Sequence, residues 1–243
     1  MKSGLGRALA GVCVAVALAA TAACGGGGDA AGSKSEGKNG DTKPAAKPAL
    51  EPLTEAELTE AAVTKADVPG YRVGKTPDEE IPEVSVPAKP ASCQAIADMF
   101  LLGTEPDATA RVSRSLGNLK QTDATVIRTA LLAHQEADAK KVFADLREQS
   151  ETCKSYEHTD YQYTAVKPQK APDLGDESLA YTMTGDVDGT KMPMSYTVVR
   201  SGSTLVVFYA ANMLEPKKVE VPVSVMEAQV AKVEKTAKAA KKA

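Results

Sequence analysis

Apolar and polar residues alternate through much of residues 177–211, with the two-residue period of β-strands. Within this region Asp188-Gly189 is a hairpin signal, because a two-residue turn needs residues that accept positive φ angles. Pairing outward from this turn places apolar residues opposite one another on a single face of the predicted hairpin. The predicted pairs are Met183 with Met194, Tyr181 with Tyr196 and Leu179 with Val198. The sequence therefore predicts an antiparallel pair with a core face and a more polar face.

Further strands extend this pattern on both sides. A turn at Ser201-Gly202 returns the chain through Leu205, Val207 and Tyr209, while Val206 and Phe208 point the opposite way, which predicts a central strand covered on both faces. Earlier in the chain, residues 109–116 and 124–134 also predict strands. With a strand edge near His158, the sheet has about six strands.

Helical periodicity surrounds these strands. A Ser or Thr followed three residues later by Glu predicts a capping box at Thr54 and again at Ser224, each opening a helix. Ser92 is predicted to cap a short helix, with Cys93 in its first turn. Residues 136–152 predict a longer helix, whose inward stripe is Ala139, Val142, Phe143 and Leu146. The fold class is α+β, a single domain with an antiparallel sheet flanked by helices.

The N-terminus has the pattern of a bacterial lipoprotein signal. Lys2 and Arg7 precede a short apolar run at residues 8–20, and the small pair Ala22-Ala23 directly precedes Cys24. The run is shorter than the roughly 20 apolar residues that a membrane-spanning helix needs. We therefore expect cleavage after Ala23 and acylation of Cys24, although Thr21 stands where lipoprotein signals usually have Leu. The alternative is a secreted protein, cleaved near the same alanines without a lipid.

Domain boundaries follow from this interpretation. Residues 1–23 form the predicted signal peptide, and residues 24–52 contain the acylated Cys24 and a tether rich in Gly, Ala, Ser, Lys and Pro. Such a composition offers too little apolar surface to fold, so we expect a flexible tether. Residues 53–243 form the predicted domain. The expected location is the outer face of the cell membrane, with membrane lipid as the partner of acylated Cys24.

Charge adds little to the choice of partner. Removing Lys2 and Arg7 with the signal leaves 27 basic against 32 acidic residues, a formal net charge of minus five. This balance gives no reason to expect a nucleic-acid partner. The lysine-rich C-terminus, from Lys232 to Lys242, is typical of a solvated helix end, with an anionic surface partner as the alternative.

Cysteine use predicts one disulfide. Of the four cysteines, Cys13 leaves with the signal and Cys24 carries the lipid, which leaves Cys93 and Cys153. Two cysteines in an oxidising compartment most often pair, so we expect a bridge between them. The pair is then unavailable for thiol catalysis.

Residue types that could support other chemistry lack the patterns that the chemistry needs. The two histidines, His134 and His158, lie in no nucleophile or HExxH motif, so structural or surface positions are expected, with His158 on an exposed strand edge. Asp186 and Asp188 resemble the opening of a calcium loop, but the hairpin accounts for Asp-Gly and the later ligands are missing. We predict no metal, no cofactor and no enzyme activity.

Two residue clusters have both a structural and a chemical interpretation. Met183, Met192 and Met194 could bind copper(I), but Met183 and Met194 fall within an apolar stripe, where methionine fills gaps in a core. Residues 173–177 concentrate carboxylates, which could perform glycosidase chemistry. A polar turn that enters a strand is the commoner explanation of this pattern.

Four short segments carry a resemblance to a known family: Cys93-Gln94-Ala95-Ile96-Ala97, Phe143-Ala144-Asp145-Leu146 leading to Cys153, Leu174-Gly175-Asp176-Glu177-Ser178, and Val198-Val199-Arg200 through Leu205-Val206-Val207. They resemble actinobacterial lipoproteins, which are similar to the extracellular sensor domain of PknH-like mycobacterial serine/threonine kinases. The resemblance covers residues 53–215 and implies an antiparallel sheet flanked by helices, a cleft for an unidentified ligand and no catalysis. This chain has one cysteine pair where the kinase sensor has two, and it has no kinase domain, so we expect no kinase signalling by the same chain.

The function expected from sequence is a ligand-binding or sensor module, anchored at the cell envelope, that takes a small ligand or a cell-wall component. The alternative is a non-catalytic envelope protein that contacts wall polymer or a protein partner. A carboxylate-dependent hydrolase is the third hypothesis. The sequence leaves the ligand-binding residues unknown.

Overall fold

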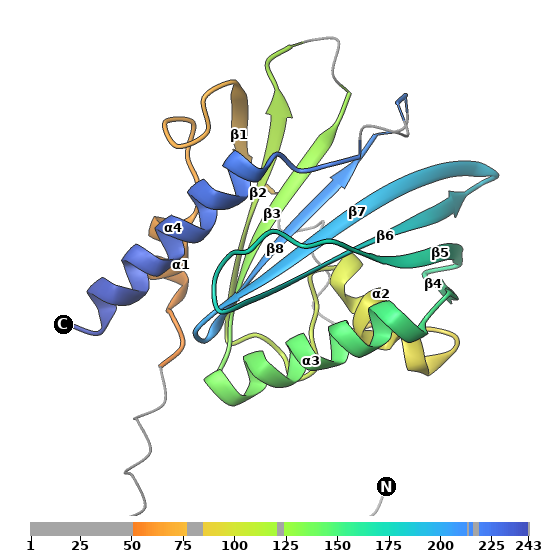
Figure 1. Ribbon diagram of the computed structural model, residues 1–243, viewed down its shortest axis with the longest axis horizontal. Coiled ribbons are helices and arrows are strands. Elements are labelled where there is room, and N and C mark those ends of the chain that lie inside the picture. Colours follow the sequence, from red (N-terminus) through yellow and green to blue (C-terminus); the bar gives the residue numbers. More distant parts are fainter. Residues whose placement is uncertain (1–50, 77–84, 121–123, 213, 216–218, 243) are drawn as a thin grey trace, which may run out of the picture. The chain divides into compact units, whose positions relative to one another are not determined.

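An eight-stranded antiparallel sheet organises the computed structural model, which describes residues 51–76, 85–120, 124–212, 214–215 and 219–242 (Figure 1). The strand order is β1-β2-β3-β8-β7-β6-β5-β4. The strands are β1 (Tyr71–Lys75), β2 (Ala110–Asn118), β3 (Val126–Ala133), β4 (Ser155–His158), β5 (Tyr161–Gln169), β6 (Glu177–Val187), β7 (Thr190–Ser201) and β8 (Thr204–Ala211). The helices are α1 (Glu55–Ala61), the 3₁₀ turn η2 (Ala91–Cys93), α2 (Gln94–Phe100), α3 (Glu136–Thr152) and α4 (Val223–Ala240).

The β6–β7 hairpin has the predicted register. Met183 pairs with Met194, Tyr181 with Tyr196 and Leu179 with Val198, and all six side chains are buried. Asp188 and Gly189 form the turn with φ angles of 50° and 81°, the left-handed conformation that a two-residue hairpin needs. Strand β8 is central, as predicted, with β3 and β7 as its neighbours.

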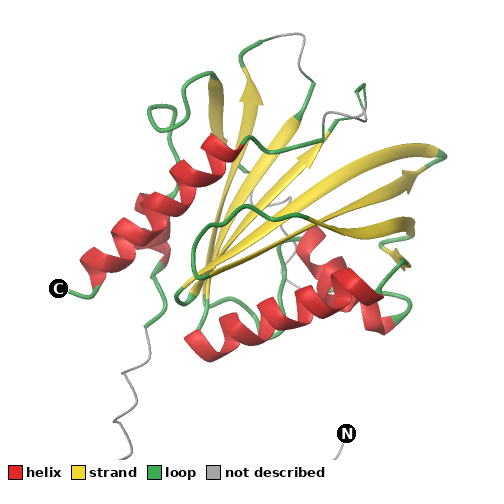
Figure 2. Ribbon diagram, in the orientation of Figure 1, coloured by secondary structure: helices red, strands yellow, loops and turns green. Residues whose placement is uncertain are grey.

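Helices cover both faces of the sheet, which gives three layers (Figure 2). Helices α2 and α3 pack on one face, and α1 and α4 pack on the other. Strand β8 serves both cores: Leu205 and Val207 face α3, while Val206 and Phe208 belong to the cluster that contains the buried side chains of α1 and α4. The α+β class and the helix-flanked antiparallel sheet are therefore confirmed.

The number of strands differs from the prediction of about six. Strand β1 is five residues long and exposes Arg72, Gly74 and Lys75, so its apolar pattern is short. The segment near His158 forms two strands, because Thr159 and Asp160 adopt positive φ angles and reverse the chain. Neither feature produces a strong strand pattern.

Helix starts agree with the prediction only in part. Thr54 and Glu57 form the expected capping box, with each side chain bonded to the other residue's backbone N–H. The box at Ser224 is wrong, because α4 begins earlier, with Pro222 at the N-cap and its carbonyl accepting from Val225. Ser92 does not cap α2 either, because it lies inside the 3₁₀ turn and Cys93 occupies the cap position.

Candidate ligand-binding site

The predicted disulfide is present. Cys93 and Cys153 are joined, with their Cα atoms 5.5 Å apart, and both are buried. The bridge ties the start of α2 to the C-terminal end of α3. It therefore holds both helices of this layer together. Cys24, the predicted lipidation site, lies outside the described residues.

The acidic segment before β6 is a structural clamp on the β7–β8 turn. Asp176 and Glu177 both pair with Arg200, at 2.9 and 2.8 Å, and the Asp176 carboxylate also accepts from the Gly202 N–H at 2.7 Å. Arg200 is buried, and hydrogen bonding to it is the main cause that lowers the pKa of Glu177. A general acid of a glycosidase needs a raised pKa, so Glu177 has the opposite electrostatics.

Both histidines are buried, so His158 is not exposed as predicted. It lies on the edge strand β4 and is only 1% exposed. The reason is that Lys89 forms two backbone hydrogen bonds with Glu157, which covers the edge. The imidazole of His158 lies 6.4 Å from the rings of Tyr156 and Tyr163.

Met183 and Met194 lie in the core and Asp186 bonds within its hairpin, whereas Met192 is only partly buried. Met183 and Met194 are 1% exposed and fill the core, and the Met183 sulfur accepts a hydrogen bond from the Tyr156 hydroxyl. Asp186 accepts from the Gly189 N–H at 2.9 Å and pairs with Lys191, as a hairpin requires. Among the described residues, no three His, Cys, Asp or Glu side chains gather closely enough to hold a metal ion.

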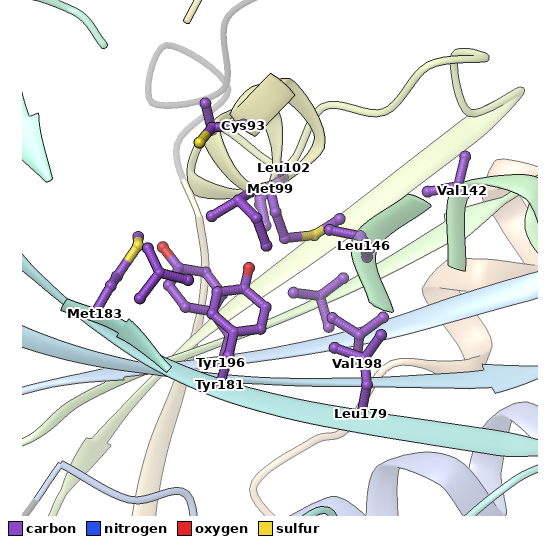
Figure 3. Packing of buried hydrophobic residues seen from close by; sticks show 14 of the residues in the cluster. Cys93, Met99, Leu102, Val142, Leu146, Leu179, Tyr181, Met183, Tyr196 and Val198 are labelled. Atoms are coloured by element: carbon purple, nitrogen blue, oxygen red, sulfur yellow. The ribbon is translucent and has the colours of Figure 1, made fainter. Parts of the chain in front are cut away.

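A cavity opens where the helix layer of α2 and α3 ends. The apolar side chains of α3, among them Val142 and Leu146, pack over the half of the sheet that includes Leu179 and Val198 (Figure 3). Met99 and Leu102 instead pack over Tyr181 and Tyr196. Beyond Tyr196, towards the ends of β3 and β8, the strands continue past the helices. The inward face of these strand ends forms the floor of the cavity.

The cavity has a volume of about 560 Å³, within the range of about 300–1,000 Å³ that is usual for small-molecule sites. Its lining is mostly apolar and comes from α2, the segment that follows it, and strands β3, β7 and β8. Val126 is 53% exposed and Leu214 is 78% exposed, which makes the rim apolar as well. The lining consists of Met99, Phe100, Leu102, Ala124, Val126, Arg128, Met192, Tyr196, Tyr209, Ala211 and Leu214.

Polar groups enter this cavity along one row of the sheet. Arg128 pairs with Tyr209 in the β3–β8 register, and Tyr209 pairs with Tyr196 in the β7–β8 register. The Tyr209 and Tyr196 rings lie 5.2 Å apart. Burial raises the pKa of Tyr209 to about 12, although the charge of Arg128 opposes the shift, so the hydroxyl stays protonated at neutral pH. The row therefore brings one cation, Arg128, and the neutral hydroxyls of Tyr209 and Tyr196 to an apolar space.

A second, smaller cavity of about 160 Å³ lies between α2 and α3. Most of its polar side chains already bond within the protein: Gln149 accepts from the Ala95 N–H at 2.8 Å, and Lys141 pairs with Asp145 at 2.7 Å. The Thr104 hydroxyl, which also lines it, has no partner among the described residues. The larger cavity is therefore the better candidate site.

The sequence pattern does not predict these lining residues as a binding site. One signal was present, because Arg128 shares its strand face with Ala130 and Leu132, and a charge in an inward position needs an explanation. Tyr209 was placed on the apolar face, which is where it lies.

The fold defines the chain as an α+β domain, with helices on both faces of one antiparallel sheet. The chain is similar to the crystal structure of the extracellular domain of PknH from Mycobacterium tuberculosis, with a TM-score of 0.50 and 12% identity over 78% of this chain and 99% of that chain. This similarity confirms the fold that the sequence resemblance implied. An Rv0999 ortholog from Mycobacterium smegmatis has a TM-score of 0.43 and 14% identity, over 74% of this chain and 97% of that chain.

Comparison by sequence gives no family. No protein-family model matches the chain, and no curated protein matches it. Within the described ranges, no helix is both long and apolar enough to cross a membrane.

Proposed function

We propose that this protein is a non-catalytic binding module, held at the outer face of the cell membrane by acylated Cys24, that takes a small apolar ligand into the cavity between α2 and the ends of β3 and β8. The observation that supports the proposal most is the cavity itself, since it is large, mostly apolar and has only a few polar groups. The export signal predicted from the sequence supports the location. The similar fold of an extracellular domain is consistent with it.

The position of the cavity also supports binding. Monomeric proteins rarely leave apolar side chains such as Val126 and Leu214 exposed beside an apolar hollow without a function. Met99 and Met192 line the cavity, and methionine side chains adapt their shape to different apolar partners.

Native mass spectrometry of the exported protein, compared with the denatured protein, tests the proposal. We expect an added mass that disappears on denaturation. The variant Ala211→Phe should lose the added mass, because its larger side chain enters the cavity floor. The matched control is Ala239→Phe, at an exposed position on α4. An added mass that persists in Ala211→Phe would contradict this location, and no added mass in any sample would favour the second function.

The second candidate function is an interaction protein of the envelope, which one observation favours. Lys235, Lys238, Lys241 and Lys242 are exposed at the end of α4, where a wall polymer that carries negative charge could bind. Sedimentation with isolated wall material, lost on replacing these lysines with Gln, would support it.

A further inference from the structure

We infer that the ligand of the cavity is an amphipathic anion, a molecule with one aliphatic chain and a carboxylate or phosphate head placed beside Arg128 and Tyr209. This inference rests on the proposed function, because it names the class of ligand that the same cavity would take. It follows from the chemistry of the lining residues.

The charge of the lining is one-sided. Among the described residues that line the cavity, Arg128 is the only charged side chain and none is a carboxylate. A ligand cation would lose its hydration without gaining an ionic partner there, which is costly in an apolar space. An anion gains the guanidinium, whose five N–H donors allow it to bind a head group in addition to its contacts within the protein.

Tyr209 adds a second donor next to the first. It is adjacent to Arg128 across β3 and β8, and its raised pKa keeps the hydroxyl proton in place at neutral pH. A carboxylate or phosphate oxygen can accept from both groups, because these heads offer several lone pairs. Both side chains are half-buried, so the head would remain close to solvent while the chain extends inward.

The other lining residues favour an aliphatic chain over a carbohydrate as the buried part of the ligand. Met99, Leu102 and Ala211 are buried and offer no hydrogen-bonding side chain, and Phe100 and Met192 are also apolar. A carbohydrate would leave most of its hydroxyl groups without partners in such surroundings. An aliphatic chain needs no partners and gains from the loss of contact with water.

The test uses the exported chain with Cys24→Ala, so that its own lipid and detergent are absent. Calorimetry would compare three probes with the same twelve-carbon chain: dodecanoate, dodecyl phosphate and dodecyltrimethylammonium. We expect the anions to bind at least tenfold more tightly than the cation, and the better anion identifies the head group. Arg128→Gln should weaken binding of the better anion by about tenfold to a hundredfold, as for a charge-assisted hydrogen bond. The control is Arg72→Gln, at an exposed position on β1, which should bind like the parent chain.

A neutral dye separates this inference from the proposed function. Nile red should bind the parent chain and Arg128→Gln equally, but not Ala211→Phe. Equal binding of anionic and cationic probes, or no effect of Arg128→Gln on the better anion, would overturn the inference while dye binding still supports the cavity. If the dye and all three probes fail to bind, both the inference and the proposed function are overturned.

Discussion

Of the described glycines, Gly175 is the one whose replacement by Ala should destabilise the fold most. Its φ angle is +64°, and a Cβ atom there would lie 2.5 Å from the Arg200 carbonyl oxygen and 2.6 Å from Val199 Cγ1. The same carbonyl accepts the Asp176 N–H at 2.8 Å, within the clamp on the β7–β8 turn. Gly175→Ala therefore perturbs backbone conformation and packing together.

The magnitude has two parts. An L-residue in the left-handed region costs roughly 1–2 kcal/mol, and overpacking in a close-packed region typically costs about 1–3 kcal/mol. Because the obstacle is partly backbone, a side-chain rotation cannot relieve it. We expect Gly175→Ala to lower the free energy of unfolding by about 2–4 kcal/mol, which allows for partial relaxation.

Variants at two other glycines distinguish the conformational cost from the packing cost. Gly189 has a φ angle of +81° but no atom within 4 Å of its added Cβ, so Gly189→Ala should cost only the conformational part, roughly 1–2 kcal/mol. Gly74 has neither a positive φ angle nor a near neighbour, and Gly74→Ala should change stability by less than about 1 kcal/mol.

Urea unfolding at 25 °C, followed by far-UV circular dichroism, would measure the three variants against the parent. The order of stability should be Gly74→Ala, then Gly189→Ala, then Gly175→Ala as the least stable. If Gly175→Ala is no less stable than Gly189→Ala, the packing of residue 175 against Arg200 is not rigid, and the account of the clamp is wrong.

Three further predictions concern the cysteines and histidines. Replacing Cys93 and Cys153 together with Ala should destabilise the domain by about 4 kcal/mol, from the entropy of a loop of 60 residues, and an unchanged melting temperature would contradict this estimate. Cys24→Ala should move the protein from the membrane fraction to the medium; continued membrane association would place the anchor elsewhere. Burial lowers the pKa of both His134 and His158, so the unfolded chain binds more protons and stability should fall as the pH drops below about 6.5. Between pH 7.5 and 5.5 the histidines are the main side chains that titrate, because carboxylates titrate mainly below pH 5. The double variant with Gln at both histidines should therefore have a free energy of unfolding that depends less on pH in this range.

Sequence patterns predicted those features of the fold that depend on residues close together in the chain. The register of β6 and β7 follows from one turn, because Asp188 and Gly189 fix the pairing and every later pair follows from it. The capping box at Thr54 likewise depends on two residues, three apart. Where the local signal was ambiguous, as at Ser92 and Ser224, the surrounding backbone decided the helix start.

The cavity could not be predicted in this way, because it depends on several elements at once. It exists because α2 is seven residues long and ends at Phe100, so it covers less of the sheet than the strands offer. Arg128 and Tyr209 become neighbours only through the pairing of β3 with β8, which no hairpin turn specifies. A sequence pattern indicates that a residue faces inward, but it does not indicate whether a helix covers it.

The direction of β8 relates the cavity to the proposed anchor. Ser203, in the turn before β8, bonds through its hydroxyl to the Glu51 carbonyl, so the described chain begins beside this end of the strand. Ala211, at the other end of β8, lines the cavity. A strand of eight residues spans roughly 23 Å at about 3.3 Å per residue, so the two features lie at opposite ends of the sheet. Glu51 therefore lies away from the cavity, and we expect removal of the anchor at Cys24 to leave ligand affinity unchanged. This independence is what allows the binding test to use the unacylated chain.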